Sequence, residues 1–450
     1  MPGKLRARAR ARLPADVLRL PQATTAADSA PAVQRLSRRE RQLLDRLQRD
    51  ALRYFLDNQL SHGFVLDRQR NHGTRSTSGL CSTSATGMGL MAVALAAAPE
   101  YRMLVPEEAR TRVQTCLRTV LERLPCDHGM VPHFLDARTL EPVGVDRIST
   151  VDSSWLAAGA LWAGSLLDCP NLQTLADRLY RRIDWRFWAA GEPCWFRHGK
   201  GSDGQFLPHT WDRLNAETAF MYALGIGADA HAALSSDCWT ELQPRYGCVA
   251  GERFASADLG LFVFQYSLEL LDFRSYYVPG ALDLYEEARV ATRANYQACK
   301  AAAAQFRTYR HFWGLSAGDG PGRDGDEDTY RCYSPLDGTD GTAHVTATLA
   351  SLSTWPALVL ENIEAAQKER RHVIHGRYGY SNINLDCDWV SRDMVGIDLG
   401  AAVLALDNFL HHGRIRRVFH GLDCVRQALE RLAARRRPVL PPDPEWRQAA

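Results

Sequence analysis

Apolar side chains recur at helical spacing in window after window of this chain. The first window follows a capping-box candidate, Ser37–Glu40, and places Leu43, Leu47 and Ala51 on one face of a helix. Ten further helical windows follow, at 85–98, 106–124, 151–167, 172–182, 216–228, 258–271, 280–303, 343–366, 399–410 and 418–435. Few segments alternate polar and apolar residues, so we expect no extensive sheet. The pattern predicts an all-α fold, a toroid of tightly packed helical hairpins.

The composition is that of a globular protein, with 46% hydrophobic and 24% charged residues among 450, which excludes disorder over most of the chain. Lys plus Arg number 54 against 52 for Asp plus Glu, and this net charge of +2 argues against nucleic-acid binding. Apolar runs such as 88–98 are shorter than the roughly 20 residues that span a bilayer. We expect one catalytic domain over 38–437, a flexible basic arm over 1–37 and a tail over 438–450.

The 11 cysteines are widely scattered and form no CxxC pair. This spacing fits neither a disulfide scaffold nor a zinc ribbon, so most are expected to be buried thiols in a reducing compartment. The basic N-terminal arm lacks the apolar segment of a signal peptide. We therefore expect a cytoplasmic protein, or a periplasmic or secreted protein if the start of the sequence is wrongly assigned.

Two carboxylates stand at the starts of apolar helical windows. Asp152 opens the window 151–167, where it is suited either to chemistry or to capping the helix. Glu217 is expected on an apolar helix face with Phe220 and Met221, where burial would raise its pKa as a general acid requires. The alternative for Glu217 is an ion pair with Arg213.

Aromatic residues gather in the loops that connect the helical windows. Beside Gly and Asp they are typical of a carbohydrate groove, in which rings stack on sugars and polar groups bond the hydroxyls. The residues are Trp185, Trp188, Trp195, Trp211, Trp239, Trp313, Trp389, Tyr276, Tyr277, Tyr378 and Tyr380.

No nucleotide-binding, hydrolase-elbow or zincin motif is present in the sequence. His128 and His133 are five residues apart, but no further metal ligands can be assigned to them. The acidic stretch 318–328 lacks the spacing of an EF-hand and is expected to be a flexible loop. We therefore expect no metal and no cofactor.

An ordered set of segments resembles the glucoamylase-like domain of bacterial endo-β-1,2-glucanases, glycoside hydrolase family 144 and its relatives, which is related to a domain of cyclic β-1,2-glucan synthases. The resemblance spans roughly residues 40 to 430. The segments are ALRYF (51–55), TGMGLMA (86–92), GMVPH (129–133), VD (151–152), IDW (183–185), NAETAFMY (215–222), FQYS (264–267), LDFR (271–274), WGLSA (313–317) and GIDLG (396–400).

The resemblance implies an (α/α)6 barrel and inverting cleavage of β-1,2-glucan or its oligosaccharides. Glu217 matches the family's general acid and Asp152 is the leading base, with Asp398 and Asp393 as alternatives. The family carries another carboxylate where this chain has Ser149. The residues expected to bind sugar are Arg274, Asp272, Trp313, Trp211, Asn215, Tyr222, His133, Gln265, Tyr378 and Trp389.

Two other functions are compatible with the same residues. One is a transglycosylase or exo-acting β-1,2-glucan enzyme on the same scaffold, because acceptor choice depends on the ends of the groove and on water exclusion. The other is a glucan-binding protein without catalytic activity. Ser149 is compatible with this function because it stands where the family carries a carboxylate.

Overall fold

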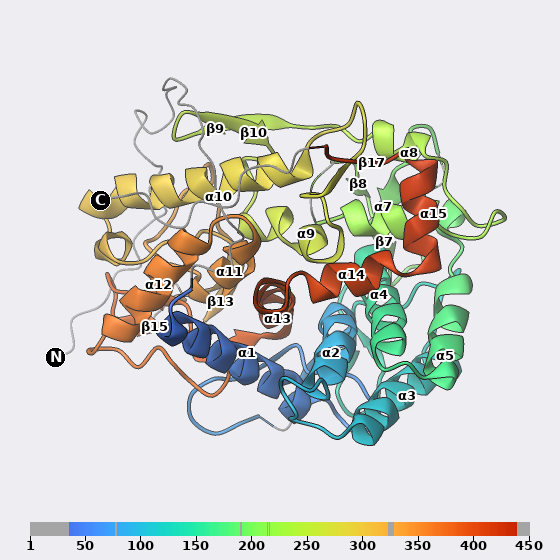
Figure 1. The fold of residues 1–450 in the computed structure, drawn as a ribbon, viewed down its shortest axis with the longest axis horizontal. Helices are drawn as coiled ribbons and strands as arrows, with labels where there is room; N and C mark the ends of the chain where they lie inside the picture. The colour runs from blue at the N-terminus through green and yellow to red at the C-terminus, as the bar shows by residue number, and fades with distance from the viewer. Residues whose placement is uncertain are drawn as a thin grey trace.

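A computed structural model describes residues 36–438 apart from 77–78, 190, 214, 216 and 323–327. The fold is helical, with short strands in the connections (Figure 1). The predicted arm over 1–37 and tail over 438–450 lie almost entirely outside the described residues. No helix in the described part of the chain is long and apolar enough to cross a membrane.

Six helices of the described chain are buried along nearly their whole length. Every residue of α2, α7, α9 and α11 is buried, and helices that are apolar all round belong in the core of a large domain. The six are α2 (Thr83–Ala96), α4 (Thr150–Leu166), α7 (Ala219–Ile226), α9 (Tyr266–Leu270), α11 (Val345–Leu349) and α13 (Gly396–Leu410).

Amphipathic helices largely alternate with the buried ones along the chain. They are α1 (Arg38–Asn58), α3 (Pro106–Glu122), α5 (Pro170–Arg181), α10 (Leu284–Ala301), α12 (Pro356–Lys368) and α15 (Asp423–Arg431). The capping box at the start of α1 is confirmed, because the Ser37 side chain accepts from the Glu40 amide and Glu40 accepts from the Ser37 amide. Shorter helical segments are α6 (Trp185–Trp188), α8 (Asp237–Thr240), α14 (Arg414–His420), η3 (Leu261–Phe264), η4 (Ala302–Ala304), η5 (Arg307–Arg310) and η6 (Ala350–Ser353).

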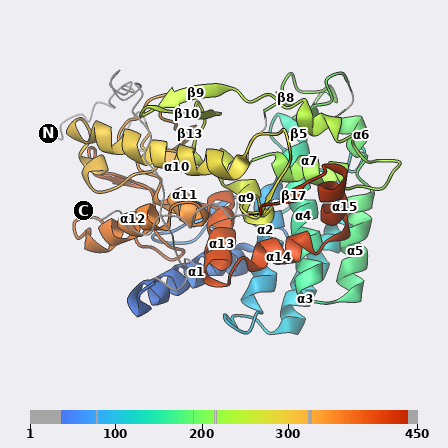
Figure 2. The ribbon, with the colours of Figure 1, turned by 45° about the horizontal axis from the view of Figure 1, so that its top comes forward.

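Helix α13 contacts helices from both halves of the chain. It packs against α1 and α2 from the start of the chain and against α9 and α11 from its second half. Figures 1 and 2 show α13 with these helices around it. The first and last large helices of the chain are therefore direct neighbours.

Helices α2 and α4 touch through their backbones. A Cβ at Gly159 would lie 1.9 Å from the Gly87 carbonyl oxygen, and a Cβ at Gly87 would lie 2.3 Å from the Trp155 carbonyl oxygen. Only glycine permits this approach at both positions. The contact sets the N-terminal turns of the two helices side by side, and these turns carry Ser84 and Asp152.

The strands pair only into small sheets of two or three strands within the described residues, as the lack of alternation predicts. The three-stranded sheet contains β2 (Leu80–Ser82), β3 (Phe134–Asp136) and β4 (Pro142–Val143). The antiparallel pairs are β1 (Arg68–Arg70) with β16 (Asp393–Val395), β5 (Asp146–Ser149) with β7 (Gly199–Gly201), β6 (Phe196–Arg197) with β8 (Thr210–Trp211), β9 (Tyr246–Val249) with β10 (Glu252–Ala255), β11 (Tyr276–Tyr277) with β17 (Arg435–Arg436), β12 (Ala317–Gly320) with β13 (Thr329–Cys332), and β14 (Ile383–Asn384) with β15 (Trp389–Val390).

Several sequence expectations are corrected by the structure. The window 343–366 is divided at Pro356, which cannot continue the preceding helix, and 418–435 is divided at Gly421. The acidic stretch contributes Asp319 to β12 rather than to a loop; its residues 323–327 lie outside the description. Cys194 and Cys238 form a disulfide, and only four of the nine free cysteines are buried, so the expectation of mostly buried thiols is wrong.

Candidate active site

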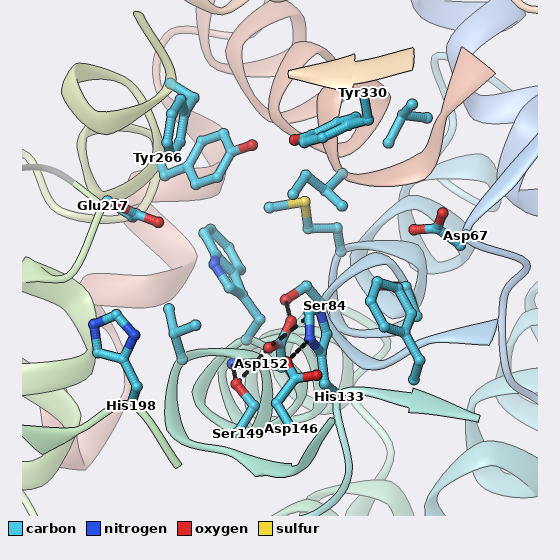
Figure 3. A pocket seen from close by; sticks show the side chains of 18 of the residues that line it. Asp67, Ser84, His133, Asp146, Ser149, Asp152, His198, Glu217, Tyr266 and Tyr330 are labelled. Atoms are coloured by element: carbon cyan, nitrogen blue, oxygen red, sulfur yellow. Dashed lines mark hydrogen bonds and ion pairs between the residues drawn. The ribbon is translucent and has the colours of Figure 1, made fainter. Parts of the chain in front are cut away.

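A cavity of about 460 Å³ lies where the N-terminal turns of the buried helices and the small sheets meet (Figure 3). Its walls come from segments spread between residues 67 and 397, so the site exists only in the folded domain. The lining residues are Asp67, Arg68, Ser82, Ser84, Met88, His133, Phe134, Asp146, Ser149, Val151, Asp152, Trp155, His198, Leu207, Trp211, Glu217, Phe262, Tyr266, Tyr330, Val395 and Ile397.

Asp152 lies in the first turn of α4 with its carboxylate on the cavity. Ser149 is the N-cap of this helix and accepts from the Asp152 amide, so the alternative that Asp152 itself caps the helix is wrong. The Asp152 carboxylate accepts hydrogen bonds from the hydroxyls of Ser84 and Ser149. These two hydrogen bonds fix the orientation of the carboxylate.

His133 links Asp152 to a second carboxylate. Its Nδ1 contacts Asp146, its Nε2 lies 3.6 Å from Oδ2 of Asp152, and its ring stacks on Phe134 with centroids 3.8 Å apart. Burial opposes a charge on the ring, but the charge of Asp152 and the hydrogen bond that the ring donates to Asp146 outweigh it and raise the pKa of His133 to about 9. His133 is therefore an imidazolium at neutral pH.

Glu217 lies in the turn before α7 and not on the helix itself, which corrects the expected window 216–228. The Asn215 side chain accepts from the Glu217 amide, an Asx turn that delays the helix to Ala219. The alternative ion pair with Arg213 is wrong, because Arg213 pairs with Asp258 at 2.8 Å. Within the described chain, no residue donates to the Glu217 carboxyl, which points into the cavity in Figure 3.

The surroundings of Glu217 favour its protonated form. Burial, and then the charge of Asp152, raise its pKa to about 8 from an ordinary value of 4.5. The cavity thus holds one carboxyl group that is protonated near neutral pH and one that is charged, and this combination can give a proton at one place and accept one at another.

Aromatic rings form much of the cavity wall. Trp211 stacks on His198 with centroids 3.9 Å apart and donates its indole N–H to Thr150. Tyr266 and Tyr330 face the cavity from the side opposite Asp152 (Figure 3), and Tyr330 is 46% exposed. Such flat faces are suited to stacking on sugar rings.

The end of the cavity near Arg68 is acidic. Arg68 pairs with Asp319 at 3.2 Å and with Asp67 at 3.4 Å. Asp398 lies nearby in the first turn of α13, where burial, then the charges of Asp319 and Asp67, raise its pKa to about 8. Asp398 is not on the cavity wall, and Asp393 pairs with Arg70 at 3.0 Å.

The structure brings four of the predicted site residues to the cavity, namely Glu217, Asp152, Trp211 and His133. Asn215 and Tyr222 support them from behind: Tyr222 is buried and its hydroxyl donates to the Trp211 carbonyl.

The remaining predicted sugar-binding residues lie away from the cavity. Trp313 is fully buried and donates to the Leu358 carbonyl, and Gln265 is bonded inside the core. The Asp272 amide donates to His420, and Arg274 follows two residues later outside the lining. Tyr378 is buried and Trp389 donates to Asp328, so neither reaches the site, and of the loop aromatics only Trp211 does.

Several cavity residues were missed by the sequence analysis. Ser84 lies in the polar start of the apolar α2, and Tyr266 lies within the FQYS segment beside the residue that was chosen, Gln265. Asp146, His198 and Tyr330 carry no comparable signal in the sequence. Among the described residues, no group of three or more His, Cys, Asp or Glu side chains could hold a metal ion.

Part of the chain is similar in sequence, and most of it is similar in fold, to proteins described as glucoamylases. Residues 208–422 match the model of the Glycoamylase family, described as "Putative glucoamylase", which confirms the resemblance to the glucoamylase-like domain. No curated protein sequence matches the chain.

Solved structures share the fold. An endo-β-1,2-glucanase from Chitinophaga pinensis, in a sophorotriose and glucose complex, has a TM-score of 0.77 and 18% identity over 88% of this chain and 98% of that one. A "putative glucoamylase" from Bacteroides uniformis ATCC 8492 has a TM-score of 0.76 and 21% identity over 89% and 98% of the two chains. A β-1,2-glucanase from Parabacteroides distasonis has a TM-score of 0.75 and 20% identity over 87% of this chain and 60% of that one.

Proposed function

We infer that this protein is an inverting endo-β-1,2-glucanase built on an (α/α)6 barrel. The observation that carries the proposal is the pair Glu217 and Asp152, a protonated carboxyl and a charged carboxylate that face one sugar-sized cavity. The alternation of buried and amphipathic helices, closed by α13, supports the barrel. The structural neighbours that act on β-1,2-glucan support the substrate.

Glu217 serves as the general acid in this mechanism. Its proton passes to the glycosidic oxygen as the bond breaks, because burial keeps the carboxyl protonated up to about pH 8. Asp152 accepts a proton from the water that attacks the opposite face of the sugar. Inversion needs room for this water, with the two carboxyl groups about 6.5–9.5 Å apart.

Asp398 is the alternative base. Because it lies behind the cavity wall, it would receive the proton through a relay of substrate hydroxyls or water. Its raised pKa of about 8 makes it a carboxylic acid at neutral pH, which favours Asp152 as the base. Asp393, paired with Arg70, is the least suited of the three.

The experiment is incubation with linear β-1,2-glucan, followed by thin-layer chromatography and by proton NMR in the first minutes. We expect a ladder of oligosaccharides and an α-anomer before mutarotation, since inversion of a β bond yields α. A single small product would indicate an exo-acting enzyme, and an initial β-anomer a retaining enzyme or transglycosylase. Binding without any release of reducing sugar, from a panel of β-glucans, would indicate a glucan-binding protein.

The compartment is part of the same proposal. A disulfide such as Cys194–Cys238 supports an oxidising environment, and the periplasm or the cell exterior fits it better than the cytoplasm. Thiol titration of the denatured protein, isolated without reductant, should find nine free thiols and eleven after reduction. Eleven before reduction would support the cytoplasm.

A further inference from the structure

We propose that His133 is a positioning residue, an imidazolium held between Asp146 and Asp152 that keeps the Asp152 carboxylate charged and oriented toward the reacting water. This role rests on the proposed function, because it assigns His133 to the carboxylate that serves as the base. It differs from the sugar-binding role that the sequence predicted for His133.

The geometry leaves the ring little freedom. His133 directly precedes β3, Asp146 begins β5, and Asp152 lies in the first turn of α4, so three separate elements meet at one imidazole. Nδ1 contacts Asp146, and Nε2 lies 3.6 Å from Asp152. Stacking on Phe134, with the rings 24° from parallel, fixes the plane of the imidazole.

The charged groups that face His133 are predominantly acidic. Asp146 on β5, Asp152 on α4 and Asp67 before β1 all favour its cationic form, and burial opposes it. Asp67 is itself paired with Arg68, and Glu217 faces Asp152 as a neutral acid. Within the described chain, His133 is the only cationic side chain recorded in contact with Asp152. Removing it would leave two carboxylates beside each other without a counter-charge, which favours protonation of the base.

The direct test is NMR titration of the histidine ring signals in the full-length protein, with His133→Gln used to assign the His133 signal. We expect a midpoint of about 9 for His133 in the wild type. In Asp146→Asn the midpoint should fall by more than one pH unit, because the charge of Asp146 is lost and the remaining amide acceptor is neutral, while burial of the ring remains. Asp203→Asn, in an exposed turn, is the matched control and should leave the midpoint unchanged. A wild-type midpoint at or below 6.5 would overturn the proposal.

The kinetic test is the pH profile of kcat and KM on β-1,2-glucan for His133→Gln. The acidic limb should move upward by about one to three pH units, with most of the rate retained above it and little change in KM. His198→Gln, at another histidine of the cavity, should leave the position of this limb unchanged. A raised KM with an unmoved limb, or a rate lost at every pH in a folded variant, would overturn the positioning role.

The two tests separate this proposal from the proposed function. If the wild type hydrolyses no glucan, the proposed function fails, and the positioning role in hydrolysis fails with it, whatever the NMR midpoint. If the wild type is active and the midpoint is at or below 6.5, only the role of His133 fails.

Discussion

Glu217 and Asp152 carry the same functional group in opposite surroundings. No described side chain donates to Glu217, and burial favours its neutral form. Asp152 receives two serine hydroxyls and lies beside the His133 imidazolium. The difference in chemical role therefore comes from the neighbours of each carboxyl group, which are set by the fold.

Glu217→Gln should lose activity by about 10²–10⁴-fold, because the amide has no proton to transfer to the leaving oxygen. The same variant should be more stable than the wild type at neutral pH. A carboxyl whose pKa is raised from 4.5 to about 8 on folding destabilises the native state progressively as pH rises through that range, and glutamine does not. We expect a gain in the free energy of unfolding of about 1–3 kcal/mol at pH 7, measured by urea denaturation.

Glu122→Gln is the matched control for this prediction. Glu122 is exposed at the end of α3, so its replacement should change neither rate nor stability. A Glu217→Gln variant with more than about a tenth of the wild-type rate would remove Glu217 from the role of acid.

Asp152→Asn should also lose most activity, by about 10²-fold or more, while the variant still folds. Ser149 caps α4, so the helix does not depend on the Asp152 charge. The comparison to make is with Asp398→Asn under the same conditions, using initial rates on β-1,2-glucan. Full activity in Asp152→Asn with loss in Asp398→Asn would transfer the role of base to Asp398.

At the residue scale, the sequence predicted both carboxylates but not what surrounds them. Glu217 and Asp152 were identifiable because they stand at the starts of apolar helices and match family segments. Their partners were not, because Ser84 meets Asp152 across 68 residues of chain and only the packing of α2 on α4 brings them together. Asp146 could not be predicted as a site residue for the same reason, because only the fold places it in contact with His133.

At the scale of elements, the backbone contact between α2 and α4 determines the geometry around Asp152. Gly159→Ala places a methyl group 1.9 Å from the Gly87 carbonyl oxygen, so the helices must move apart. We expect a loss of about 1–3 kcal/mol in stability, typical of overpacking, and a fall in activity as Ser84 moves away from Asp152. Thermal denaturation and initial rates measure the two effects.

Gly164→Ala, on the same helix, is the matched control. Its new methyl group would meet Gln173 at 3.4 Å, an ordinary contact, and alanine favours the helix by up to about 1 kcal/mol. Equal effects of the two substitutions would show that the close approach at Gly159 is unimportant.

Most helices could be predicted from periodicity, because apolar runs and capping residues are local signals. The residues at which these helices begin and end could not be predicted in this way. The turn that delays α7 depends on the Asn215 side chain, and the division at Pro356 interrupts a window whose apolar pattern continues across it. The small sheets also escaped prediction, since strands of two to four residues show no alternation that could be distinguished from a loop.

For the whole molecule, we expect stability to fall as pH rises from about 5 to 9. Glu217 and Asp398 both have pKa values raised to about 8, so the native state holds protons that the unfolded chain has already released. His133 adds stability that is complete below about 6.5 and is lost as pH rises through about 9. Glu217, Asp398 and His133 therefore all lower the free energy of unfolding as pH rises through this range.

Calorimetry at pH 5, 6.5, 8 and 9 tests this expectation, and the double variant Glu217→Gln with Asp398→Asn should flatten the slope between pH 5 and 8. A wild-type melting temperature that rises from pH 5 to pH 8 would contradict it.

The contact between α1 and α13 has a consequence for synthesis of the chain. Helix α1 packs mainly on α13, and roughly 340 residues separate the end of one from the start of the other. At ordinary translation rates the ribosome needs roughly 20 to 70 seconds to make that interval, and throughout it the apolar face of α1 lacks its main partner. We therefore expect nascent chains to need this apolar face shielded until α13 is made, and the cavity to be complete only after α13, which carries Ile397, has docked.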